Sequence, residues 1–329
     1  MNFADAIALV RSGTDFLVTC HRRPDADALG SALGLARILK RIGKRATVFV
    51  PETLPLNLRF LPAPGEIVLV LPDDARFDAT FVTDTAAASL LPVGLPPREV
   101  RGPLVVVDHH AAHDDVGDVI VRDVKACATG EIVVRIADEL GAGSFDESIA
   151  QPLYAAIVAD TGGFRYPVTT AATLRIGARL LEAGADPWLV AYHLFEGWEA
   201  ERLRLLGMVL DTLETELDGK LALLRVTRAM LASCGANDDM VEGMVNYGRM
   251  LLGVQVACLL WEWPVALEDG TSRIDTKVSL RSRGVIDISR IAVALGGGGH
   301  RGAAGAQLPG DLDAARKLVV AEARKLLEV

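Results

Sequence analysis

Carboxylates and imidazoles follow apolar stretches at several points in this sequence. The segment VTCHRRPDADALGS, residues 18–31, places His21, Asp25 and Asp27 within a window of seven residues. Three further apolar runs, FVT, LVVV and YAAIVA, are each followed directly by acids or histidines, namely Asp84, Asp108, His109, His110 and Asp160. Ligands of open α/β sheets bind at the carboxyl ends of the strands. We therefore expect these side chains to meet at one edge of a sheet.

Crowded carboxylates are unfavourable unless their charge is neutralised. Two carboxylates about 4 Å apart repel each other by roughly 4 kcal/mol at an effective dielectric constant of about 20. The acids expected at this edge are Asp25, Asp27, Asp84 and Asp160. Two divalent cations would balance their charge, and a mixed carboxylate and imidazole set suits Mn²⁺, with Mg²⁺, Zn²⁺ or Fe²⁺ as alternatives. Such a pair, about 3.5–4 Å apart, activates water and holds a phosphate for in-line displacement.

A second group of residues that could bind phosphate lies near the end of the chain. The run GGGGHRGAAGA, residues 296–306, places four glycines before His300. Glycine lets backbone amides approach an anion closely. Arg281, in the segment VSLRS, could add a charge-assisted hydrogen bond to phosphate. Each feature alone has a simpler interpretation as a turn residue, a flexible loop or a surface charge, and only their combination favours a site.

The hydrophobic pattern predicts the elements that position these residues. Runs rich in Val and Ile predict strands at 16–20, 45–50, 66–71, 79–84, 103–108 and 118–123. A helix is predicted at 28–43, ending at Gly43, and another at 129–141, with Thr129 as the N-cap and Gly141 at the end. Strands of this kind alternating with helices are typical of a mainly parallel α/β sheet.

The second half of the chain has a different pattern. It is helical from Thr170 to about Leu217, and strands are then predicted at 221–227, 253–263 and 273–282, with a hairpin turn at 268–270 and an amphipathic C-terminal helix. We therefore predict an α/β fold in three parts. An N-terminal domain at 1–190 has a mainly parallel sheet flanked by helices, a helical linker occupies 191–217, and a smaller α/β domain with a mixed sheet occupies 218–329.

Composition restricts the class of protein. The chain has 329 residues, 50% hydrophobic and 23% charged, which is typical of globular proteins and favours two domains. We find no run apolar enough to cross a bilayer and no secretory signal pattern at the N-terminus. The net charge of −9 weighs against general binding of duplex nucleic acid. Four cysteines without paired spacing indicate a reducing compartment, so we expect a cytoplasmic protein.

Five motifs, taken in order, resemble those of a known family. They are HRRPDADALGS, the TD that ends at Asp84, VVVDHH, ADTGGFRY and GGGGHRGAAG. Together they cover nearly the whole chain and are similar to the DHH phosphoesterase superfamily with its DHH-associated C-terminal domain. The size of the chain resembles the subgroup of bacterial oligoribonucleases, or nanoRNases, that also dephosphorylate pAp (3′-phosphoadenosine 5′-phosphate). The resemblance implies that 1–190 is the catalytic, metal-binding domain and that 218–329 binds substrate.

The resemblance also implies a ligand set for two divalent cations, most simply Mn²⁺ with Mg²⁺ as an alternative. One ion would be held by His21, Asp25 and Asp84. The other would be held by Asp27, Asp84, His109 and Asp160. Asp84 would then bridge the two ions, and a bridging water or hydroxide would be the nucleophile.

Further roles follow from the same resemblance. His110 would face the scissile phosphate or the leaving oxygen, and Asp108 would orient the histidine pair. In the C-terminal domain the nucleotide would be bound by Arg281, Gly298, Gly299 and His300. The helical linker would set the separation of the domains, and hinge closure is an expectation of this arrangement.

These roles imply a manganese-dependent phosphoesterase that hydrolyses short oligoribonucleotides to mononucleotides and pAp to AMP. The motifs do not separate this activity from that of a phosphodiesterase for linear or cyclic dinucleotides such as cyclic-di-AMP. A non-catalytic nucleotide-binding protein is a further alternative, but its mark would be a missing metal ligand, and none is missing. The expected partners are short single-stranded RNA, dinucleotides or pAp, without duplex-specific or membrane binding. A homodimer is a general expectation for such a protein.

Three places depart from the usual pattern of the family. Asn is common where His113 stands, Arg where Leu90 stands, and Ser-Asn where Pro167 and Val168 follow TGGFRY. None of them is an expected metal ligand. We therefore expect these departures to affect the choice of substrate more than the chemistry.

Overall fold

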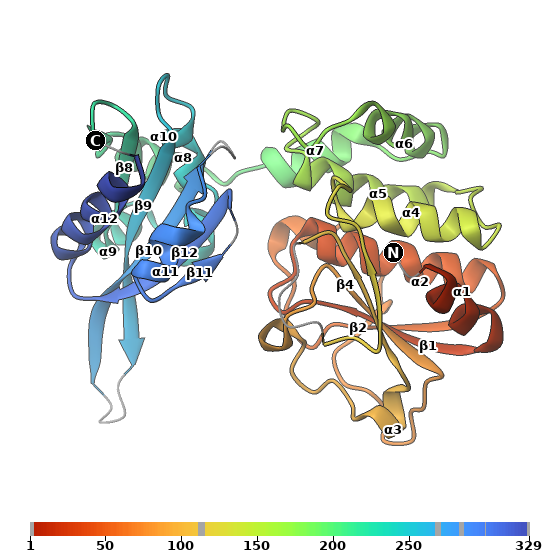
Figure 1. Cartoon of the computed structure of the whole chain (residues 1–329). Coiled ribbons are helices and arrows are strands. Elements are labelled where there is room, and N and C mark those ends of the chain that lie inside the picture. Colours follow the sequence, from red (N-terminus) through yellow and green to blue (C-terminus); the bar gives the residue numbers. More distant parts are fainter. Residues whose placement is uncertain (1–2, 111–115, 267–270, 283–285, 300, 328–329) are drawn as a thin grey trace. The chain divides into compact units, whose positions relative to one another are not determined.

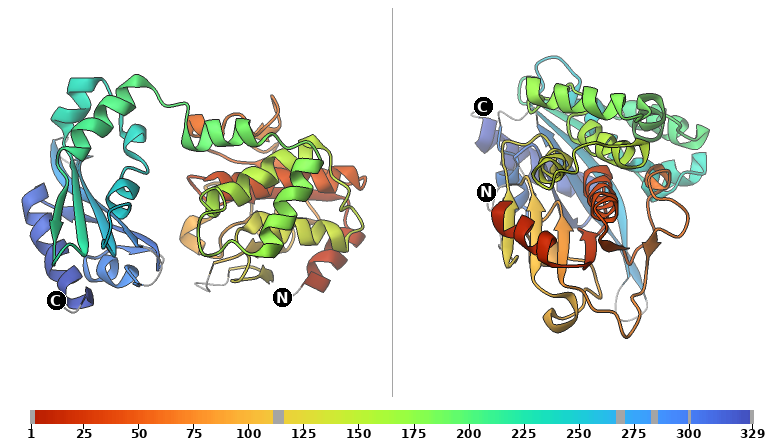
Figure 2. Two further views of the ribbon diagram at one scale, coloured as in Figure 1. Left: turned by 90° about the horizontal axis from the view of Figure 1, so that it is seen from above. Right: turned by 90° about the vertical axis from the view of Figure 1, so that its right-hand side faces the viewer.

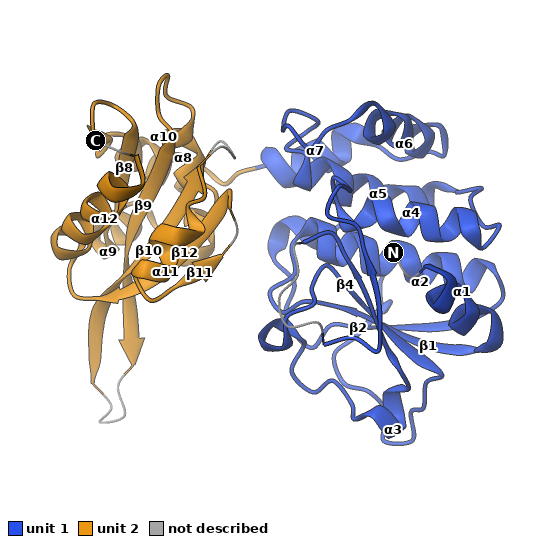
Figure 3. Cartoon of the chain, in the orientation of Figure 1, with its two compact units in different colours: residues 1–197 blue, residues 198–329 orange. Residues whose placement is uncertain are grey.

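The computed structural model describes residues 3–110, 116–266, 271–282, 286–299 and 301–327. It divides the chain into two units, residues 1–197 and residues 198–329 (Figure 3). Each unit has its own sheet and its own hydrophobic core. The division lies inside the predicted linker.

The predicted linker at 191–217 is shared between the two units. Helix α7 (Pro187–Phe195) packs within unit 1, where its residue Val190 is buried in the core. Helix α8 (Ala200–Leu210) packs within unit 2, where Leu205 belongs to the core. Because each helix buries its apolar residues in a different core, the chain changes unit between them.

Unit 1 is built on a parallel sheet, as the alternation of strands and helices predicted. Its strands are β1 (Asp15–Cys20), β2 (Arg45–Phe49), β3 (Ile67–Val68), β4 (Ala79–Thr83), β5 (Leu104–Asp108) and β6 (Val119–Arg122). Their order is β3-β2-β1-β4-β5-β6, and all neighbours are parallel. The chain builds from β1 to β3 in one direction and from β4 to β6 in the other. The reversal lies between β1 and β4, where a doubly wound sheet opens a crevice at its carboxyl edge.

Strand β3 is shorter than the strand predicted at 66–71. Among the described residues it is an edge strand, and it pairs with β2 through two residue pairs. Leu69 and Val70 follow it with exposed side chains. An edge position has no second neighbouring strand that would extend the pairing.

Helices and short 3₁₀ turns accompany this sheet. They are α1 (Phe3–Ser12), α2 (Ala26–Arg41), α3 (Arg98–Arg101), α4 (Thr129–Glu139), α5 (Glu147–Asp160), α6 (Ala171–Glu182) and α7, with short 3₁₀ turns η1 (Leu56–Leu58) and η2 (Ala88–Leu90). Helix α2 lies on the sheet, α4 and α5 pack against α2, and α6 and α7 pack against α5 (Figure 1). Because α2 is covered on both sides, nearly all of it is buried.

The apolar segment before Asp160 is helix α5 and not a strand at the sheet edge. A continuous apolar run does not show by its periodicity whether it forms a buried strand or a buried helix. Helix α5 is apolar around most of its surface because α2 lies on one side and α6 and α7 lie on the other. Asp160 is thus supplied by the end of a helix.

Gly30 in α2 allows α5 to approach closely. A Cβ atom at this position would lie 2.3 Å from the carbonyl oxygen of Pro152. A contact this short is sterically excluded, so a side chain at residue 30 would push the two helices apart. The spacing of these helices positions Asp27, at the start of α2, relative to Asp160, at the end of α5.

We expect Gly30→Ala to destabilise unit 1, although alanine has the higher helix propensity. The added methyl group meets backbone, and such overpacking costs about 1–3 kcal/mol. Gly207→Ala in α8 is the matched control, because no described atom lies within 4 Å of its Cβ position. It should increase the free energy of unfolding by up to about 1 kcal/mol. Urea unfolding measures both changes, and a stabilised Gly30→Ala variant would contradict the close packing.

Unit 2 is built on a mixed sheet, as predicted. Its strands are β7 (Glu214–Glu216), β8 (Leu221–Val226), β9 (Val256–Ala266), β10 (Ser272–Ser282), β11 (Gly298–Gly299) and β12 (Ala303–Pro309). Their order is β11-β12-β10-β9-β8-β7. Strands β8 and β9 are parallel, and the other neighbours are antiparallel. The turn predicted at 268–270 lies outside the described residues.

Helices cover the two faces of this second sheet. They are α8, α9 (Arg228–Cys234), α10 (Val245–Arg249), α11 (Ser289–Ala294) and α12 (Leu312–Leu327), with the 3₁₀ turn η3 (Asp238–Val241). Residues of α8, α9 and α10 form one core with the sheet, and residues of α11 and α12 form another on the opposite face (Figure 2). Among the described residues of the whole chain, no helix has the length and apolar character needed to span a membrane.

Candidate metal centre and active site

The predicted residues of unit 1 gather where the strand order reverses. The segment with His21, Asp25 and Asp27 leads from β1 into α2, and Asp84 directly follows β4. The triplet 108–110 begins at the last residue of β5. These three strands are neighbours and parallel, so their carboxyl ends lie at one edge of the sheet. The structure thus brings these side chains together at the crevice.

One group in the cluster consists of His21, Asp25 and Asp84. The Nε2 atom of His21 lies 3.4 Å from Asp84 Oδ2 and 3.9 Å from Asp25 Oδ1. The other ring nitrogen, Nδ1, lies 2.8 Å from the carbonyl oxygen of Arg22 and therefore carries the proton of a neutral ring. The Nε2 lone pair then lies beside two carboxylates. Such an arrangement is suited to a bound cation.

A second group consists of Asp27, His109 and Asp160. The Nε2 atom of His109 lies 3.0 Å from Asp160 Oδ2 and 3.8 Å from Asp27 Oδ2. It also lies 3.6 Å from Oδ1 of Asp84, which belongs to the first group. In each group, one potential ligand atom from every residue lies within 4.8 Å of the others. Asp84 is therefore placed to contribute to both groups.

Asp84 has an uncommon backbone conformation. Its φ angle is +67°, in the left-handed region that Asp and Asn adopt more readily than most other residues. Its N–H still donates to the carbonyl oxygen of Val107 at 2.8 Å. Its side chain is buried, and Oδ1 accepts a hydrogen bond of 2.9 Å from the Thr129 hydroxyl. Backbone strain at a buried carboxylate is typical of functional sites.

Asp27 is fully buried and accepts three hydrogen bonds. Its Oδ1 accepts from the Ser31 hydroxyl and from the Gly130 N–H, both at 3.0 Å, and its Oδ2 accepts from the Thr129 N–H at 2.7 Å. The two N–H groups belong to the first turn of α4, where the helix dipole favours negative charge. The predicted N-cap at Thr129 is wrong, because Ala128 is the N-cap residue and the Asp27 carboxylate takes the place of a capping side chain.

His109 shows most directly that the cluster fits a cation. Its Nδ1 lies 3.3 Å from the carbonyl oxygen of Ala126, which assigns the proton of a neutral ring to Nδ1. Its Nε2 is buried and has no hydrogen-bond partner among the described residues, although three carboxylates lie nearby. The lone pair of a neutral ring nitrogen repels carboxylate oxygens that face it, and a cation bound between them removes this repulsion. Mixed imidazole and carboxylate ligands suit divalent transition metals.

The charges in the cluster depend strongly on one another. Burial, and then the charge of Asp160, raises the pKa of Asp27 from 3.8 to about 7. Burial, and then the charges of Asp27 and Asp25, raises the pKa of Asp84 well above its ordinary value. Burial opposes protonation of His109, but its close contact with Asp160 and the charges around it raise its pKa to about 10. Without cations, the cluster holds protons in their place.

The position of Asp160 adds to the unfavourable negative charge of the cluster. It is the last residue of α5, where the helix dipole is negative. A carboxylate at this end is disfavoured by about 0.3–1 kcal/mol when it is exposed, and a nearby cation reverses the effect. The side chain of Asp160 is 27% exposed, so it lies at the open side of the cluster, whereas Asp27 and Asp84 lie deeper.

The metal-free protein should lose stability as the pH rises. The folded pKa of Asp27 is about 7 against 3.8, and that of His109 is about 10 against 6.5, so the folded state binds more protons between these values. The free energy of unfolding should then fall by up to about 1.4 kcal/mol per pH unit in each window, from pH 4 to 7 and from pH 6.5 to 10. Urea unfolding in chelator at pH 6 and pH 9 measures this slope. Higher stability at pH 9 would contradict it.

His110 stands beside the cluster and is held by Asp108. Asp108 is fully buried, and its Oδ1 accepts from Nδ1 of His110 at 2.9 Å and from the His110 N–H at 3.1 Å. Burial raises the pKa of Asp108, but the hydrogen bonds from His110 outweigh it and lower the pKa. The Nδ1 atom of His110 also lies 3.5 Å from Asp84 Oδ1, and Asp84, His109 and His110 form a third compact group. Asp108 thus fixes the His110 ring next to the carboxylates.

The residues predicted to bind nucleotide belong to unit 2. Arg281 stands near the end of β10, where its Nη1 donates to a backbone carbonyl oxygen at 2.9 Å. Gly298 and Gly299 form the short edge strand β11 beside β12. A Cβ atom on Gly299 would lie 2.5 Å from Ala304 Cα, which explains the need for glycine there. His300 lies outside the described residues.

The positions that depart from the family pattern lie at the surface where they are described. Leu90 ends η2 with 42% of its surface exposed, and its carbonyl oxygen accepts from the Arg22 N–H at 2.8 Å. Val168 is 46% exposed. His113 lies outside the described residues. The contact with Arg22 places residue 90 next to the segment that carries the first ligand group.

Two polar residues of the cluster were not predicted from the sequence. Thr129 contributes both its N–H and its hydroxyl, and Ser31 contributes a hydroxyl to Asp27. The available signal was the Thr-Gly pair at the start of the predicted helix 129–141, which also suits an anion-binding helix N-terminus. Ser31 gives no such signal, because a small polar residue inside a helix is common.

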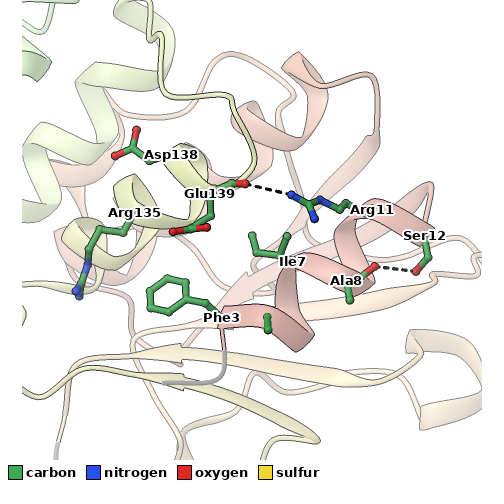
Figure 4. A pocket seen from close by; sticks show the side chains of 9 residues that line it. Phe3, Ile7, Ala8, Arg11, Ser12, Arg135, Asp138 and Glu139 are labelled. Atoms are coloured by element: carbon green, nitrogen blue, oxygen red, sulfur yellow. Dashed lines mark hydrogen bonds between the residues drawn. The ribbon is translucent and has the colours of Figure 1, made fainter.

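A wide groove in unit 1 lies elsewhere. Its volume is about 1170 Å³, and it runs between α1 and α4, where Phe3, Ile7, Arg11 and Glu139 line it (Figure 4). Arg11 donates to the carbonyl oxygen of Glu139 at 3.5 Å. None of the predicted site residues that the structure describes lines this groove. The chemistry of the acidic and imidazole cluster, and not cavity size, identifies the candidate active site.

Known proteins share both the sequence and the fold of this chain. Residues 15–157 match the DHH family, N-terminal domain, and residues 220–325 match the DHHA1 domain. The bifunctional oligoribonuclease and PAP phosphatase NrnA of Thermus thermophilus is 37% identical over 314 residues, covering 94% of this chain and 89% of that protein. The chain belongs to the DHH family. The resemblance predicted from the five motifs is therefore confirmed.

More distant relatives show how far the DHH architecture extends. The cyclic-di-AMP phosphodiesterase PdeA of Listeria monocytogenes is 27% identical over 348 residues, covering 97% of this chain and 47% of that protein. An exopolyphosphatase-related protein from Bacteroides fragilis has a crystal structure that matches with a TM-score of 0.86 at 24% identity, covering 99% of this chain and 97% of the other. This likeness shows the fold. Membership of the DHH phosphoesterases makes the chain a metal-dependent hydrolase of phosphoester bonds, with acids and imidazoles able to bind metal.

Proposed function

We propose that this protein is a manganese-dependent phosphoesterase that hydrolyses short oligoribonucleotides to mononucleotides and pAp to AMP. The observation that carries the proposal is the pair of potential ligand groups that meet at Asp84. The substrate class is supported by the similarity to the oligoribonuclease and PAP phosphatase of Thermus thermophilus, which extends over nearly the whole of both chains.

Two divalent cations, Mn²⁺ or alternatively Mg²⁺, are part of this proposal. His21, Asp25 and Asp84 would hold one ion. The other would be held by Asp27, Asp84, His109 and Asp160. Bound there, the ions would neutralise the carboxylates, polarise the attacking water and compensate the charge of the phosphate. The N–H groups of α4 that bind Asp27 would keep this carboxylate in place.

His110 is the proposed proton donor to the leaving oxygen. The 2.9 Å contact with Asp108 keeps Nδ1 protonated and fixes both the tautomer and the orientation of the ring. With Nδ1 committed to Asp108, Nε2 on the opposite side of the ring is the atom that would hold and release the catalytic proton.

In unit 2, the proposed substrate-binding residues are Arg281, Gly298, Gly299 and His300. Arg281 would give charge-assisted hydrogen bonds to a phosphate group. The glycines would let the backbone approach the nucleotide closely. The motif around residues 296–306, together with the match of residues 220–325 to the DHHA1 domain, supports this assignment.

A phosphodiesterase for linear or cyclic dinucleotides is the second candidate. The similarity to the cyclic-di-AMP phosphodiesterase of Listeria monocytogenes favours it, but this chain spans 47% of that protein. A non-catalytic nucleotide-binding protein is less well supported, because the cluster combines every acid and imidazole of the proposed ligand set.

A substrate panel tests these alternatives. The protein is stripped with a chelator, reloaded with Mn²⁺, and assayed with a dinucleotide, a pentaribonucleotide, pAp and cyclic-di-AMP. We expect kcat/KM to be highest for the short RNAs, measurable for pAp and lowest for cyclic-di-AMP. Full activity in excess chelator would exclude the metal mechanism. A preference for cyclic-di-AMP would replace the proposal with the second candidate.

We also propose that the protein acts in the cytoplasm. The cysteines are unpaired in the structure, and three of the four are buried. Unpaired cysteines are typical of reducing compartments. Fractionation of cells that produce the protein tests this assignment.

A further inference from the structure

Unit 2 contains an unpaired buried donor outside the residues discussed so far. Trp261 of β9 is 6% exposed, and its indole Nε1 has no hydrogen-bond partner among the described residues. Buried polar groups in native proteins nearly always have a partner, so an exception requires an explanation. Trp261 is also one of the residues that line a cavity of about 40 Å³, together with Lys277 and Ser279 of β10.

Lys277 is fixed beside this cavity by two aromatic rings. It stands directly opposite Trp261 in the antiparallel pairing of β9 and β10. Its Nζ lies 4.8 Å from the ring centroid of Trp261 and 4.7 Å from that of Trp263. It forms no ion pair with any carboxylate of the described residues. A cation held by two rings and not neutralised by an acid is preorganised for an anionic ligand.

The cavity suits an oxygen atom that accepts several hydrogen bonds. Three of the residues that line it carry hydrogen-bond donors, namely the indole N–H of Trp261, the ammonium group of Lys277 and the hydroxyl of Ser279. Its volume of about 40 Å³ admits a water molecule or a phosphate oxygen but not a nucleobase. Glu242 also lines the cavity, but it is exposed, and solvent screens its charge. A phosphate oxygen matches the three donors and the positive charge.

This cavity lies on the same face of β10 as Arg281. Alternate residues of a strand share a face, so Lys277, Ser279 and Arg281 lie on one side. Val278 and Leu280 lie on the other side, in the core formed with α11 and α12. At a rise of about 3.4 Å per residue, Lys277 and Arg281 are about 14 Å apart along the strand. The two cations are therefore too far apart for a single phosphate group.

We propose that the cavity beside Trp261 is a second phosphate subsite, which binds a phosphodiester of an oligoribonucleotide at a distance from the group bound by Arg281. The inference rests on the proposed function and specifies which substrates use this subsite. A chain of several nucleotides supplies phosphates to both positions. pAp is a single nucleotide and is too short to reach both.

Kinetics with a pentaribonucleotide and with pAp test the subsite. Lys277→Met removes the charge while keeping the length of the side chain, and Trp261→Phe removes the N–H while keeping an aromatic ring. Each should raise KM for the pentaribonucleotide about tenfold, without changing its kcat or the kinetics with pAp. Lys277→Arg keeps the positive charge and should therefore have the same KM as the wild type. Lys277→Met should also reduce the slope of log(kcat/KM) against log[salt] by about 0.7, the value for one lost phosphate contact.

Lys317→Met is the matched control. Lys317 is exposed on α12, which packs against the opposite face of the sheet, so the same charge is lost away from the cavity. Its KM values and salt slope should equal those of the wild type.

Direct binding separates this inference from the proposed function. Fluorescence anisotropy of a labelled pentaribonucleotide, in excess chelator to prevent turnover, should show a Kd about tenfold higher for Lys277→Met than for the wild type. Wild-type affinity in both Lys277→Met and Trp261→Phe overturns the subsite, and so does an equal loss with pAp. The proposed function fails in a different way, when the wild type loaded with Mn²⁺ hydrolyses neither substrate.

Discussion

Replacement of Asp84 by Asn should reduce kcat/KM for every substrate by at least about 10³-fold. The two oxygens of Asp84 lie 3.4 Å from His21 Nε2 and 3.6 Å from His109 Nε2, so this carboxylate contacts both ligand groups. Loss of its charge should weaken both proposed ion sites at once. Asn is the appropriate replacement because it tolerates the φ angle of +67° at this position, which preserves the backbone.

Steady-state kinetics and metal analysis of the purified Asp84→Asn protein measure this effect. We expect its metal content to fall together with its activity. Asp73→Asn is the matched control, since Asp73 is an exposed aspartate of the same unit, and it should keep wild-type values. Asp84→Asn protein that is active and fully loaded with metal would contradict the role of Asp84 as a carboxylate shared by both ligand groups.

Leu90→Ala should change the ratio of kcat/KM between substrates without abolishing turnover.

The same Asp84→Asn substitution should act on stability in the opposite direction when metal is absent. Asp84 is buried beside Asp27, and burial and like charge raise its pKa. Removing the ionisable group relieves this unfavourable charge, so Tm in chelator should be higher than that of the wild type. In Mn²⁺ the order should reverse, because the variant gains less from binding. A merely misfolded variant would be less stable under both conditions.

His110→Asn should lower kcat by about 10²- to 10⁴-fold, the usual contribution of a general acid. The ring is held by the 2.9 Å hydrogen bond from Nδ1 to Asp108, which orients it beside the cluster. Because His110 is not in the proposed ligand set, the metal content of the variant should equal that of the wild type. Metal analysis alongside single-turnover kinetics checks both expectations.

Asp108→Asn provides the companion measurement for His110. Asp108 acts by orienting the histidine, so Asp108→Asn should lower kcat less than His110→Asn does, by about 10- to 100-fold. KM should stay close to the wild-type value, because Asp108 acts by positioning the His110 ring. Loss of bound metal from His110→Asn would mean that the third group, formed by Asp84, His109 and His110, binds an ion. That outcome would replace the proton-donor role with a ligand role.

The clustering of residues after β1, β4 and β5 could be predicted because parallel strands share one carboxyl edge. The apolar runs before His21, Asp84 and Asp108 identify the strands. The residues that follow parallel strands lie at the carboxyl edge of the sheet, and this does not depend on how the helices pack. Charge repulsion among the acids then indicates cations. These steps need only strand periodicity and elementary electrostatics, and the order of the motifs adds the family.

The route by which Asp160 reaches the cluster could not be predicted in this way. A buried helix and a buried strand both appear as continuous apolar runs, and α5 is a helix because α2 and the outer helices cover it on both sides. The stabilisation of Asp27 by the N–H groups of α4 likewise depends on a contact between distant segments. The boundary between the units also depends on which core each helix joins.

By itself, the sequence determined the residue types, their order and the family, because these are properties of the linear chain and of local periodicity. Only the tertiary structure decided which atoms face each other. The buried Nε2 of His109 among three carboxylates, and the pairing of Lys277 with Trp261 across two strands, are relations between residues far apart in the chain. Burial and strand register set these relations, and neither can be read from composition or spacing.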